Sequence, residues 1–241
     1  MAEADILKGG FLYYDTPVGV LCLESFFPKP KGHLRNPLTF DFPVVCSVVQ
    51  GVNIPKLLFD RSPELVRPFI DAAVKLEKEG VKAITGSCGF LARYQEQISD
   101  SVQVPVFMSS LLQIPMVRLL HGPSARIGVL TASRSALTRE HFAGTGSRME
   151  DVFIKGMEGY PEFWEVIIEG KRNDFDMIRL EDEICRAASG IAEEKKLDAL
   201  VLECTDLSAF SHAIQKKINI PVYDINSLTT YVHSAVLRRP Y

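Results

Sequence analysis

The sequence predicts an α/β protein with two pseudo-symmetric lobes, each a doubly wound parallel sheet, and an active-site cleft between the lobes. Three observations lead to this. Short apolar runs alternate with amphipathic stretches along all 241 residues, the second half of the chain repeats the first, and the composition, 46% hydrophobic and 24% charged, is that of a globular protein. Alternating strands and helices are typical of βαβ units, whose sheets are parallel.

Eight apolar runs have the length and composition of strands that are covered on both faces. They are Val18–Glu24, Phe42–Val49, Val81–Gly86, Val104–Met108, Arg126–Ala132, Asp151–Gly156, Asp198–Glu203 and Ile220–Ile225.

The clearest helix prediction is Pro63–Lys78, with apolar residues at helical spacing, Ser62 as its cap and Gly80 at its end. Further helices are predicted at Ser133–Phe142, Leu180–Lys195, Leu207–Lys217 and Ser227–Leu237.

The connection 25–41 contains three prolines and has no helical or strand period. It is either a lid or binding loop, or a solvated surface segment. Its basic residues, Lys29, Lys31 and Arg35, could attract an acidic substrate, although a solvated basic loop is the expected role.

The internal repeat is seen when the chain is shifted by 116 positions, which places Cys88 on Cys204 and "VPVF" (104–107) on "IPVY" (220–223). A shift of 109 places 19–21 on 128–130 in the same way. We therefore expect a first lobe formed by 1–109 and 228–241, which carries Cys88, and a second lobe formed by 110–227, which carries Cys204.

Five cysteines with long spacings and no CxxC pair favour free thiols over disulfides or a structural zinc site. Three of them, Cys22, Cys46 and Cys185, are expected to be small core residues. Cys88 and Cys204 instead follow strands at the carboxyl edge of a sheet, where open α/β proteins bind ligands. A helix that begins at each of these two thiols would lower the thiol pKa.

Polar residues beside these positions are the candidates for substrate binding. Those next to the two cysteines are Ser87, Gly89, Thr205 and Asp206, and those at the ends of the equivalent strands are Glu24, Ser25, Thr131 and Ser133. For the hydroxyl groups, capping of a helix is an equally good role. His141 is expected near the surface at a helix end.

Two thiols on opposite sides of one cleft can invert a carbon stereocentre, because one removes a proton and the other returns a proton to the opposite face. Four segments, "GVLCLESFFPKPKGHLRNPLTFDFPV" (19–44), "TGSCGFLARY" (85–94), "VLECTDLSAFSHAIQ" (201–215) and "IPVYDINSL" (220–228), resemble the aspartate/glutamate racemase superfamily, which includes hydantoin racemases. The resemblance implies catalytic cysteines at Cys88 and Cys204, a dimer or larger homo-oligomer, and no pyridoxal phosphate, metal or nucleotide cofactor.

The expected function is therefore a cofactor-independent amino-acid racemase, an isomerase acting on a small carboxylate or amino acid. Glutamate racemases have a histidine where this chain has Asp206, which argues against that particular substrate. The alternatives are a hydantoin racemase, a superfamily decarboxylase or cis–trans isomerase, a thiol redox protein and a cysteine hydrolase.

The net charge of −3 gives no electrostatic basis for nucleic-acid or membrane partners. The first ten residues lack the pattern of a signal peptide, and no apolar run is long enough for a membrane helix, so a cytoplasmic location is expected.

Overall fold

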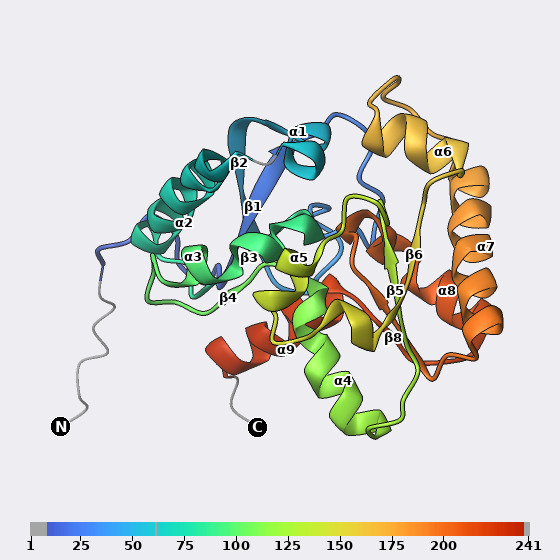
Figure 1. Cartoon of the computed structure of the whole chain (residues 1–241). Helices are drawn as coiled ribbons and strands as arrows, with labels where there is room; N and C mark the ends of the chain where they lie inside the picture. Colours follow the sequence, from blue (N-terminus) through green and yellow to red (C-terminus); the bar gives the residue numbers. More distant parts are fainter. Residues whose placement is uncertain (1–8, 61, 239–241) are drawn as a thin grey trace.

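The computed structural model describes residues 9–60 and 62–238, and it contains two four-stranded parallel sheets with helices around them (Figure 1). The order in the first sheet is β2-β1-β3-β4, formed by β1 (Val18–Glu24), β2 (Val44–Asn53), β3 (Ala83–Gly86) and β4 (Val106–Phe107). The order in the second sheet is β6-β5-β7-β8, formed by β5 (Ile127–Thr131), β6 (Phe153–Gly156), β7 (Ala199–Leu202) and β8 (Val222–Tyr223). The predicted fold class is confirmed.

The strand register repeats between the sheets as the sequence does. Val18 of β1 is opposite Ala83 of β3, and Ile127 of β5 is opposite Ala199 of β7. The two pairs are related by the same two shifts that align the halves of the sequence. β3 and β7 therefore end at equivalent points, each two residues before a cysteine.

The α-helices are α1 (Ile54–Phe59), α2 (Arg67–Glu79), α3 (Gln95–Ser99), α4 (Ile114–His121), α5 (Arg139–Ala143), α6 (Pro161–Phe163), α7 (Met177–Lys195), α8 (Ser211–Ile218) and α9 (Ile225–Val236). The shorter 3₁₀ turns are η1 (Pro63–Val66), η2 (Gly89–Tyr94), η3 (Ser110–Gln113), η4 (Met149–Asp151) and η6 (Thr205–Phe210), and η5 (Trp164–Ile168) is a π-helical turn.

The helix predicted at Pro63–Lys78 begins with the 3₁₀ turn η1 and continues as α2. Pro68, in the first turn of α2, has no N–H to extend an α-helical ladder from the preceding turn, so the regular helix starts late. Ser62 does not cap the helix; its hydroxyl donates to the Glu64 carboxylate. Gly80 does end it, with a φ of +110° that a residue with a side chain rarely adopts.

The helix predicted at Ser133–Phe142 is mostly wrong, because only α5 is α-helical there. The Ser133 hydroxyl accepts a hydrogen bond from the Ala136 N–H, which holds a turn, and Thr138 has the extended backbone of an N-cap. The chain therefore becomes α-helical only after Thr138.

The C-terminal helix α9 packs on the first sheet. Ile225 and Leu228 lie in one buried cluster with Val18, Val20 and Ala83. The division of the chain after residue 109 stays a prediction, and its ends, residues 1–8 and 239–241, lie outside the described residues.

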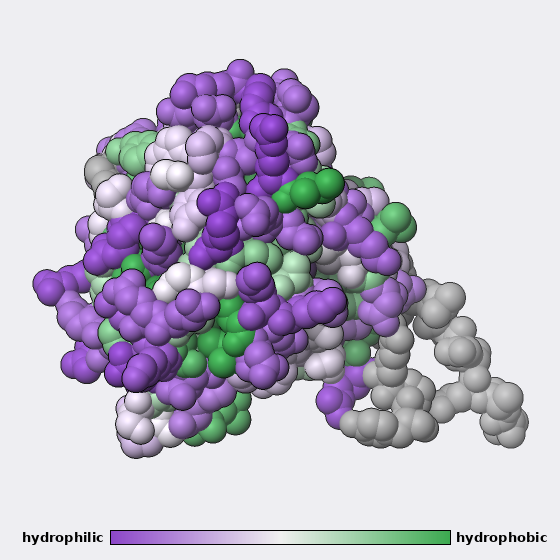
Figure 2. Space-filling view, turned by 90° about the vertical axis from the view of Figure 1, so that its right-hand side faces the viewer, coloured by the Kyte–Doolittle hydropathy of each residue, from purple (hydrophilic) through white to green (hydrophobic). Residues whose placement is uncertain are grey.

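The face that α7 and α8 present to the right in Figure 1 is mostly hydrophilic (Figure 2). Within the described ranges, no helix has the length and apolarity needed to cross a membrane.

Candidate active site

Cys88 and Cys204 occupy equivalent places in the two lobes. Cys88 follows β3 and Cys204 follows β7, each one of the two central strands of its sheet. Each cysteine is the N-cap of a 3₁₀ turn, η2 or η6. Both thiols are nearly inaccessible, with exposed fractions of 8% and 4%. The hydroxyl of Thr205 donates to the carbonyl of Ser87, so the segments that carry the two cysteines touch across the boundary between the sheets.

The expected lowering of the thiol pKa values is wrong. Burial raises the pKa of Cys88, and the nearby Glu203 carboxyl raises it further. Burial also raises the pKa of Cys204, and the carboxyl groups of Asp206 and Glu203 add to the effect. A 3₁₀ turn of six residues has only a small dipole, and here desolvation and the neighbouring carboxyl groups outweigh it.

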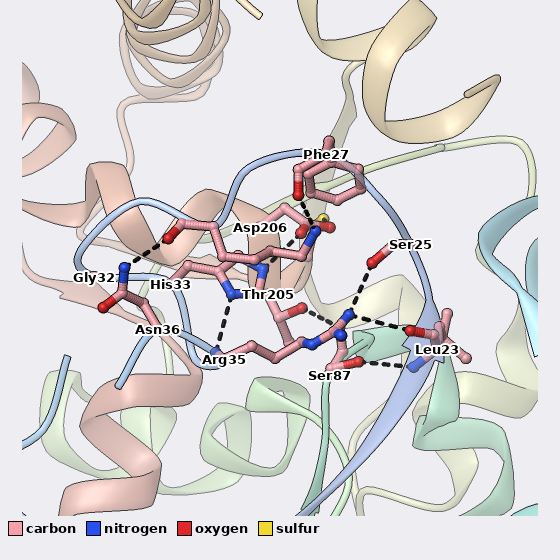
Figure 3. A network of polar contacts seen from close by, with 12 residues as sticks. Leu23, Ser25, Phe27, Gly32, His33, Arg35, Asn36, Ser87, Thr205 and Asp206 are labelled. Atoms are coloured by element: carbon pink, nitrogen blue, oxygen red, sulfur yellow. Dashed lines mark hydrogen bonds and ion pairs between the residues drawn. The ribbon is translucent and has the colours of Figure 1, made fainter. Parts of the chain in front are cut away.

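Asp206 connects Cys204 to the long connection 25–41. The Cys204 thiol donates to Oδ2 of Asp206, with a distance of 3.6 Å from Sγ. The other oxygen, Oδ1, lies 2.9 Å from Nε2 of His33, whose side chain is 3% exposed. The Arg35 N–H donates to Nδ1 of His33, so in the neutral ring the proton is on Nε2 and is donated to Asp206. Figure 3 shows His33 and Asp206 facing each other.

The connection 25–41 is a solvated basic loop only in part, because Lys31 is exposed whereas Lys29 and Arg35 are not. Its Arg35 side chain donates from Nη1 to the Leu23 carbonyl and the Ser25 hydroxyl (Figure 3), and is half-buried. Lys29 is also half-buried, and burial lowers its pKa to about 8. Asn226 of α9 donates to the Gly32 carbonyl, so the loop reaches from the end of β1 to a helix near the second cysteine.

The hydroxyls next to the cysteines hold backbone groups. Ser87 Oγ accepts from the Leu23 N–H at 3.1 Å, and Thr205 donates to the Ser87 carbonyl (Figure 3). Both side chains are buried. These bonds join the end of β1, the end of β3 and the start of η6.

The candidates at the end of β5 face two carboxyl groups. Thr131 Oγ1 donates to Oε2 of Glu203 at 2.7 Å, and Ser133 Oγ donates to Oε1 of Glu158 at 2.9 Å. Both hydroxyl residues are fully buried. In this structure their hydroxyls are therefore used within the second lobe.

Glu24 and Ser25 line an open pocket of about 210 Å³ that lies between the two lobes. Its walls come from the end of β1, the start of α1 and the segment around η5, namely 24–27, 53–55, 166–170 and 173. Neither cysteine lines this pocket. Phe27 and Ile167 line both this pocket and a smaller hollow that includes His33 and Asp206.

Gly89 packs directly on Glu203. A Cβ built on Gly89 would lie 2.0 Å from the Glu203 carbonyl oxygen and 2.4 Å from Oε1. Glu203 is completely buried, and burial raises its pKa to about 8. No residue other than glycine fits at position 89 while Glu203 stays in place.

Glu203 and His33 are the two residues of this region that were not among the candidates from the sequence. Glu203 directly precedes Cys204 at the carboxyl edge of a buried strand, which is a signal that the sequence does contain. His33 lies 171 positions before Cys204 in a loop without a period, and no local pattern links it to the site.

The predictions for the remaining cysteines and for His141 are correct only in part. Cys22 is buried as expected, Cys185 is half-buried, and Cys46 is exposed because β2 is an edge strand. His141 is 1% exposed rather than superficial, with its Nδ1 bonded to the N-cap Thr138. Among residues 9–60 and 62–238 there is no group of three His, Cys, Asp or Glu side chains placed to hold a metal ion.

The chain is similar in sequence to curated dimethylsulfoniopropionate lyases. Dimethylsulfoniopropionate lyase 3 of Emiliania huxleyi (strain CCMP1516) is 32% identical over 225 residues, which are 88% of this chain and 58% of that protein. Dimethylsulfoniopropionate lyase 7 of the same organism is 30% identical over 237 residues, 92% of this chain and 68% of the relative. The chain thus spans little more than half the length of the first relative. No family model matches the sequence.

Solved structures of the racemase superfamily have the same fold. Glutamate racemase from Francisella tularensis subsp. tularensis SCHU S4, in complex with D-glutamate, has a TM-score of 0.58 and 16% identity, covering 94% of this chain and 85% of that one. Arylmalonate decarboxylase has a TM-score of 0.55 and 15% identity, covering 91% and 92%. The resemblance to this superfamily is therefore correct for the fold.

The predicted activity is wrong. The relatives that cover most of the chain are named lyases, so an amino-acid racemase, and with it the isomerase class, does not describe this protein. The racemase-like fold of this chain therefore does not define its reaction.

Proposed function

The chain belongs to the family of dimethylsulfoniopropionate lyases, and we propose that it cleaves dimethylsulfoniopropionate into dimethyl sulfide and acrylate. The similarity to curated lyases over 92% of the chain carries this proposal. The paired cysteines and the carboxyl group of Asp206 support a mechanism for it.

The substrate carries a carboxylate at one end and a dimethylsulfonium group on the carbon next to the α-carbon. Removal of an α-proton lets the electrons of the C–H bond form the carbon–carbon double bond. The C–S bond breaks, and its electron pair leaves with sulfur as neutral dimethyl sulfide. A racemase and this lyase thus share the first step, proton abstraction beside a carboxylate, and differ in the fate of the electron pair that this step releases.

Elimination needs one base, whereas inversion of a stereocentre needs a partner on each face. We assign the base to Cys204, because its thiol donates to Oδ2 of Asp206 across 3.6 Å. Asp206 would accept the thiol proton, and the resulting thiolate would take the α-proton of the substrate. Among the described residues no carboxylate is bonded to Cys88 in this way, and the Cys88 thiol would close the opposite side of the site.

The raised thiol pKa values are compatible with this role. Burial and the neighbouring carboxyl group of Asp206 disfavour a negative charge on the Cys204 sulfur. A bound sulfonium group brings a positive charge into the same low-dielectric region and favours the thiolate. The thiol would therefore become a base mainly when the substrate is present.

The substrate carboxylate has two cationic candidates in the connection 25–41. The guanidinium of Arg35 is fixed at the end of β1 by Leu23 and Ser25, and the ammonium of Lys29 lies within electrostatic range of Asp206. The pocket lined by Glu24 and Ser25 would then be the entrance between the lobes. A homo-oligomer, a cytoplasmic location and the absence of nucleic-acid or membrane partners remain proposals from the sequence.

The test is release of dimethyl sulfide, measured in the headspace above the purified chain with dimethylsulfoniopropionate. We expect release by the unmodified chain and a loss of roughly 10²- to 10⁴-fold in Cys204→Ser, the usual contribution of a positioned base. Cys185→Ser, which changes a half-buried thiol outside the site, is the matched control. Equal release by the chain and by Cys204→Ser would refute the proposal.

A further inference from the structure

Glu203 is a fully buried carboxyl group that the reaction above leaves unused. Its Oε2 accepts a hydrogen bond from Thr131 at 2.7 Å. Its Oε1 has no hydrogen-bond partner among the described residues, although it lies against Gly89 with no access to solvent. A buried polar atom without a partner is rare in folded proteins and calls for a physical reason.

Two other buried glutamates show how a carboxyl group is accommodated in this fold. Glu183 accepts hydrogen bonds from the N–H groups of Glu162 and Phe163, both at 3.0 Å. Glu162 is bonded to the guanidinium of Arg172 at 2.8 Å. Each of these carboxylates has a second donor or a positive charge, which a buried anion requires.

Glu203 has neither within the described part of the chain. The titratable groups that face it are the carboxyl of Asp206 and the thiols of Cys88 and Cys204, and none of these offers a positive charge to offset an anion. The hydrogen-bond pattern instead fits a neutral acid. Oε2 receives the Thr131 proton and is then the carbonyl oxygen, which leaves Oε1 to carry the proton of the acid.

We propose that Glu203 is a neutral carboxylic acid in the resting protein, and that its neutrality keeps the two neighbouring thiols available for proton transfer. When Glu203 loses its proton to solvent at alkaline pH, a negative charge appears near Cys88 and Cys204 and disfavours both thiolates. Glu203 is thus a positioning residue that sets the alkaline limit of the site. Burial, which raises its pKa to about 8, agrees with this. The link to catalysis rests on the proposed lyase function, whereas the neutral state does not.

Infrared difference spectroscopy tests the neutral state without substrate. The unmodified chain minus Glu203→Gln, near neutral pH, should show the carbonyl stretch of a protonated carboxylic acid, and this band should vanish well above pH 8. Glu183→Gln is the matched control, since it removes a buried carboxylate that is satisfied by two N–H groups and should leave the band unchanged. Absence of the band would overturn the proposal.

Alkylation of Cys204 by iodoacetamide, mapped by mass spectrometry across pH, tests the effect on the thiol. In the unmodified chain the rate should rise less steeply above pH 8, as Glu203 ionises. In Glu203→Gln it should keep rising and be about tenfold faster at high pH, the effect of one unit in a thiol pKa. Thr131→Val removes the hydroxyl that favours the Glu203 anion. The pH at which the alkylation rate begins to rise less steeply, here called the bend, should therefore be higher in this variant. Thr131→Val also tests the proposal if Glu203→Gln does not fold. Identical pH profiles in all three proteins would overturn the proposal.

Neither readout needs the lyase reaction, so the two proposals can fail separately. A chain that shows the band and the bend but releases no dimethyl sulfide would refute the proposed function and leave Glu203 as a neutral acid. An active lyase without the band would refute the neutral acid. If the chain is an active lyase, its rate of dimethyl sulfide release should fall at alkaline pH because Glu203 ionises. The same fall in Glu203→Gln would refute the control of the site by Glu203.

Discussion

Nε2 of His33 lies 2.9 Å from Oδ1 of Asp206, and this contact ties the connection 25–41 to the second cysteine of the site. The ring is held from its other side by the Arg35 N–H, 3.0 Å from Nδ1. With Oδ1 occupied, Oδ2 is left to accept from the Cys204 thiol. A loop residue far away in sequence thereby orients the group that we assign as acceptor of the Cys204 proton.

Replacing His33 should lower turnover more than substrate affinity. In His33→Leu, Asp206 loses its donor, and we expect kcat for dimethyl sulfide release to fall roughly 10- to 100-fold, as for loss of one hydrogen bond to a charged group. KM should change little. His33→Gln keeps an N–H donor and should restore most of the rate in the same steady-state assay. Equal losses in the two variants would show that the ring matters only for packing.

Asp206→Asn tests the proton acceptor itself. The amide keeps the size of the side chain and an oxygen for His33, yet it cannot take the thiol proton, so we expect kcat to fall roughly 10²- to 10⁴-fold. Circular dichroism should show an unchanged fold. More than a tenth of the original rate in this variant would contradict the role assigned to Asp206.

Gly89→Ala should destabilise the protein. The added Cβ would lie 2.0 Å from the Glu203 carbonyl oxygen, a backbone atom that cannot move aside, and overpacking of this kind costs about 1–3 kcal/mol. Urea denaturation provides the free energy of unfolding. Gly190→Ala in α7 is the matched control, because its Cβ would meet nothing within 4 Å. That change should stabilise the helix by about 0.5–1 kcal/mol. Equal effects of the two changes would contradict the packing of Gly89 on Glu203.

The free energy of unfolding should depend on pH through Glu203. Its pKa is raised to about 8 in the folded protein, so between about pH 4.5 and 8 the folded state holds a proton that the unfolded chain has lost. The stabilisation of the folded state by this proton is complete below pH 4.5. It falls by up to about 1.4 kcal/mol per pH unit as the pH rises to 8. In Glu203→Gln, urea titrations across this range should show a weaker decline. An unchanged slope would mean that Glu203 is already ionised at pH 5.

Cys46 should be the most reactive thiol of the resting protein. It is exposed on β2, and the neighbouring thiol of Cys22 lowers the pKa of Cys46 to about 7. Iodoacetamide at neutral pH should therefore modify Cys46 before the other four cysteines, as read by peptide mapping. In Cys22→Ala this neighbouring thiol is lost, and modification of Cys46 should slow by about tenfold or more. Faster modification of Cys204 than of Cys46 would contradict this order.

The fold could be predicted from the sequence because buried parallel strands, helical periodicity and the repeat all give the same result. The predicted elements were wrong where local hydrogen bonds or the position of a strand in its sheet determined the structure. Ser133 and Thr138 bond to nearby backbone groups and delay the helix expected from residue 133 onward. Cys46 was expected in the core because its run is apolar, but the order of strands places it on an edge.

The positions of the two cysteines were also predictable, but their chemistry was not. The pKa of each thiol depends on burial and on Glu203 and Asp206, and the sequence reveals neither the burial nor the distances. The reaction class was not predictable from the cysteine motifs, because abstraction of an α-proton is common to racemisation and elimination. What distinguishes them is the leaving group of the substrate.

The most direct measurement monitors dimethylsulfoniopropionate by proton NMR in D₂O with the unmodified chain and with Cys204→Ser. We expect equal amounts of acrylate and dimethyl sulfide with the unmodified chain, and an unchanged substrate with the variant. Exchange of the α-protons for deuterium with the C–S bond intact would contradict the proposed function, because the site would then abstract protons without being a lyase.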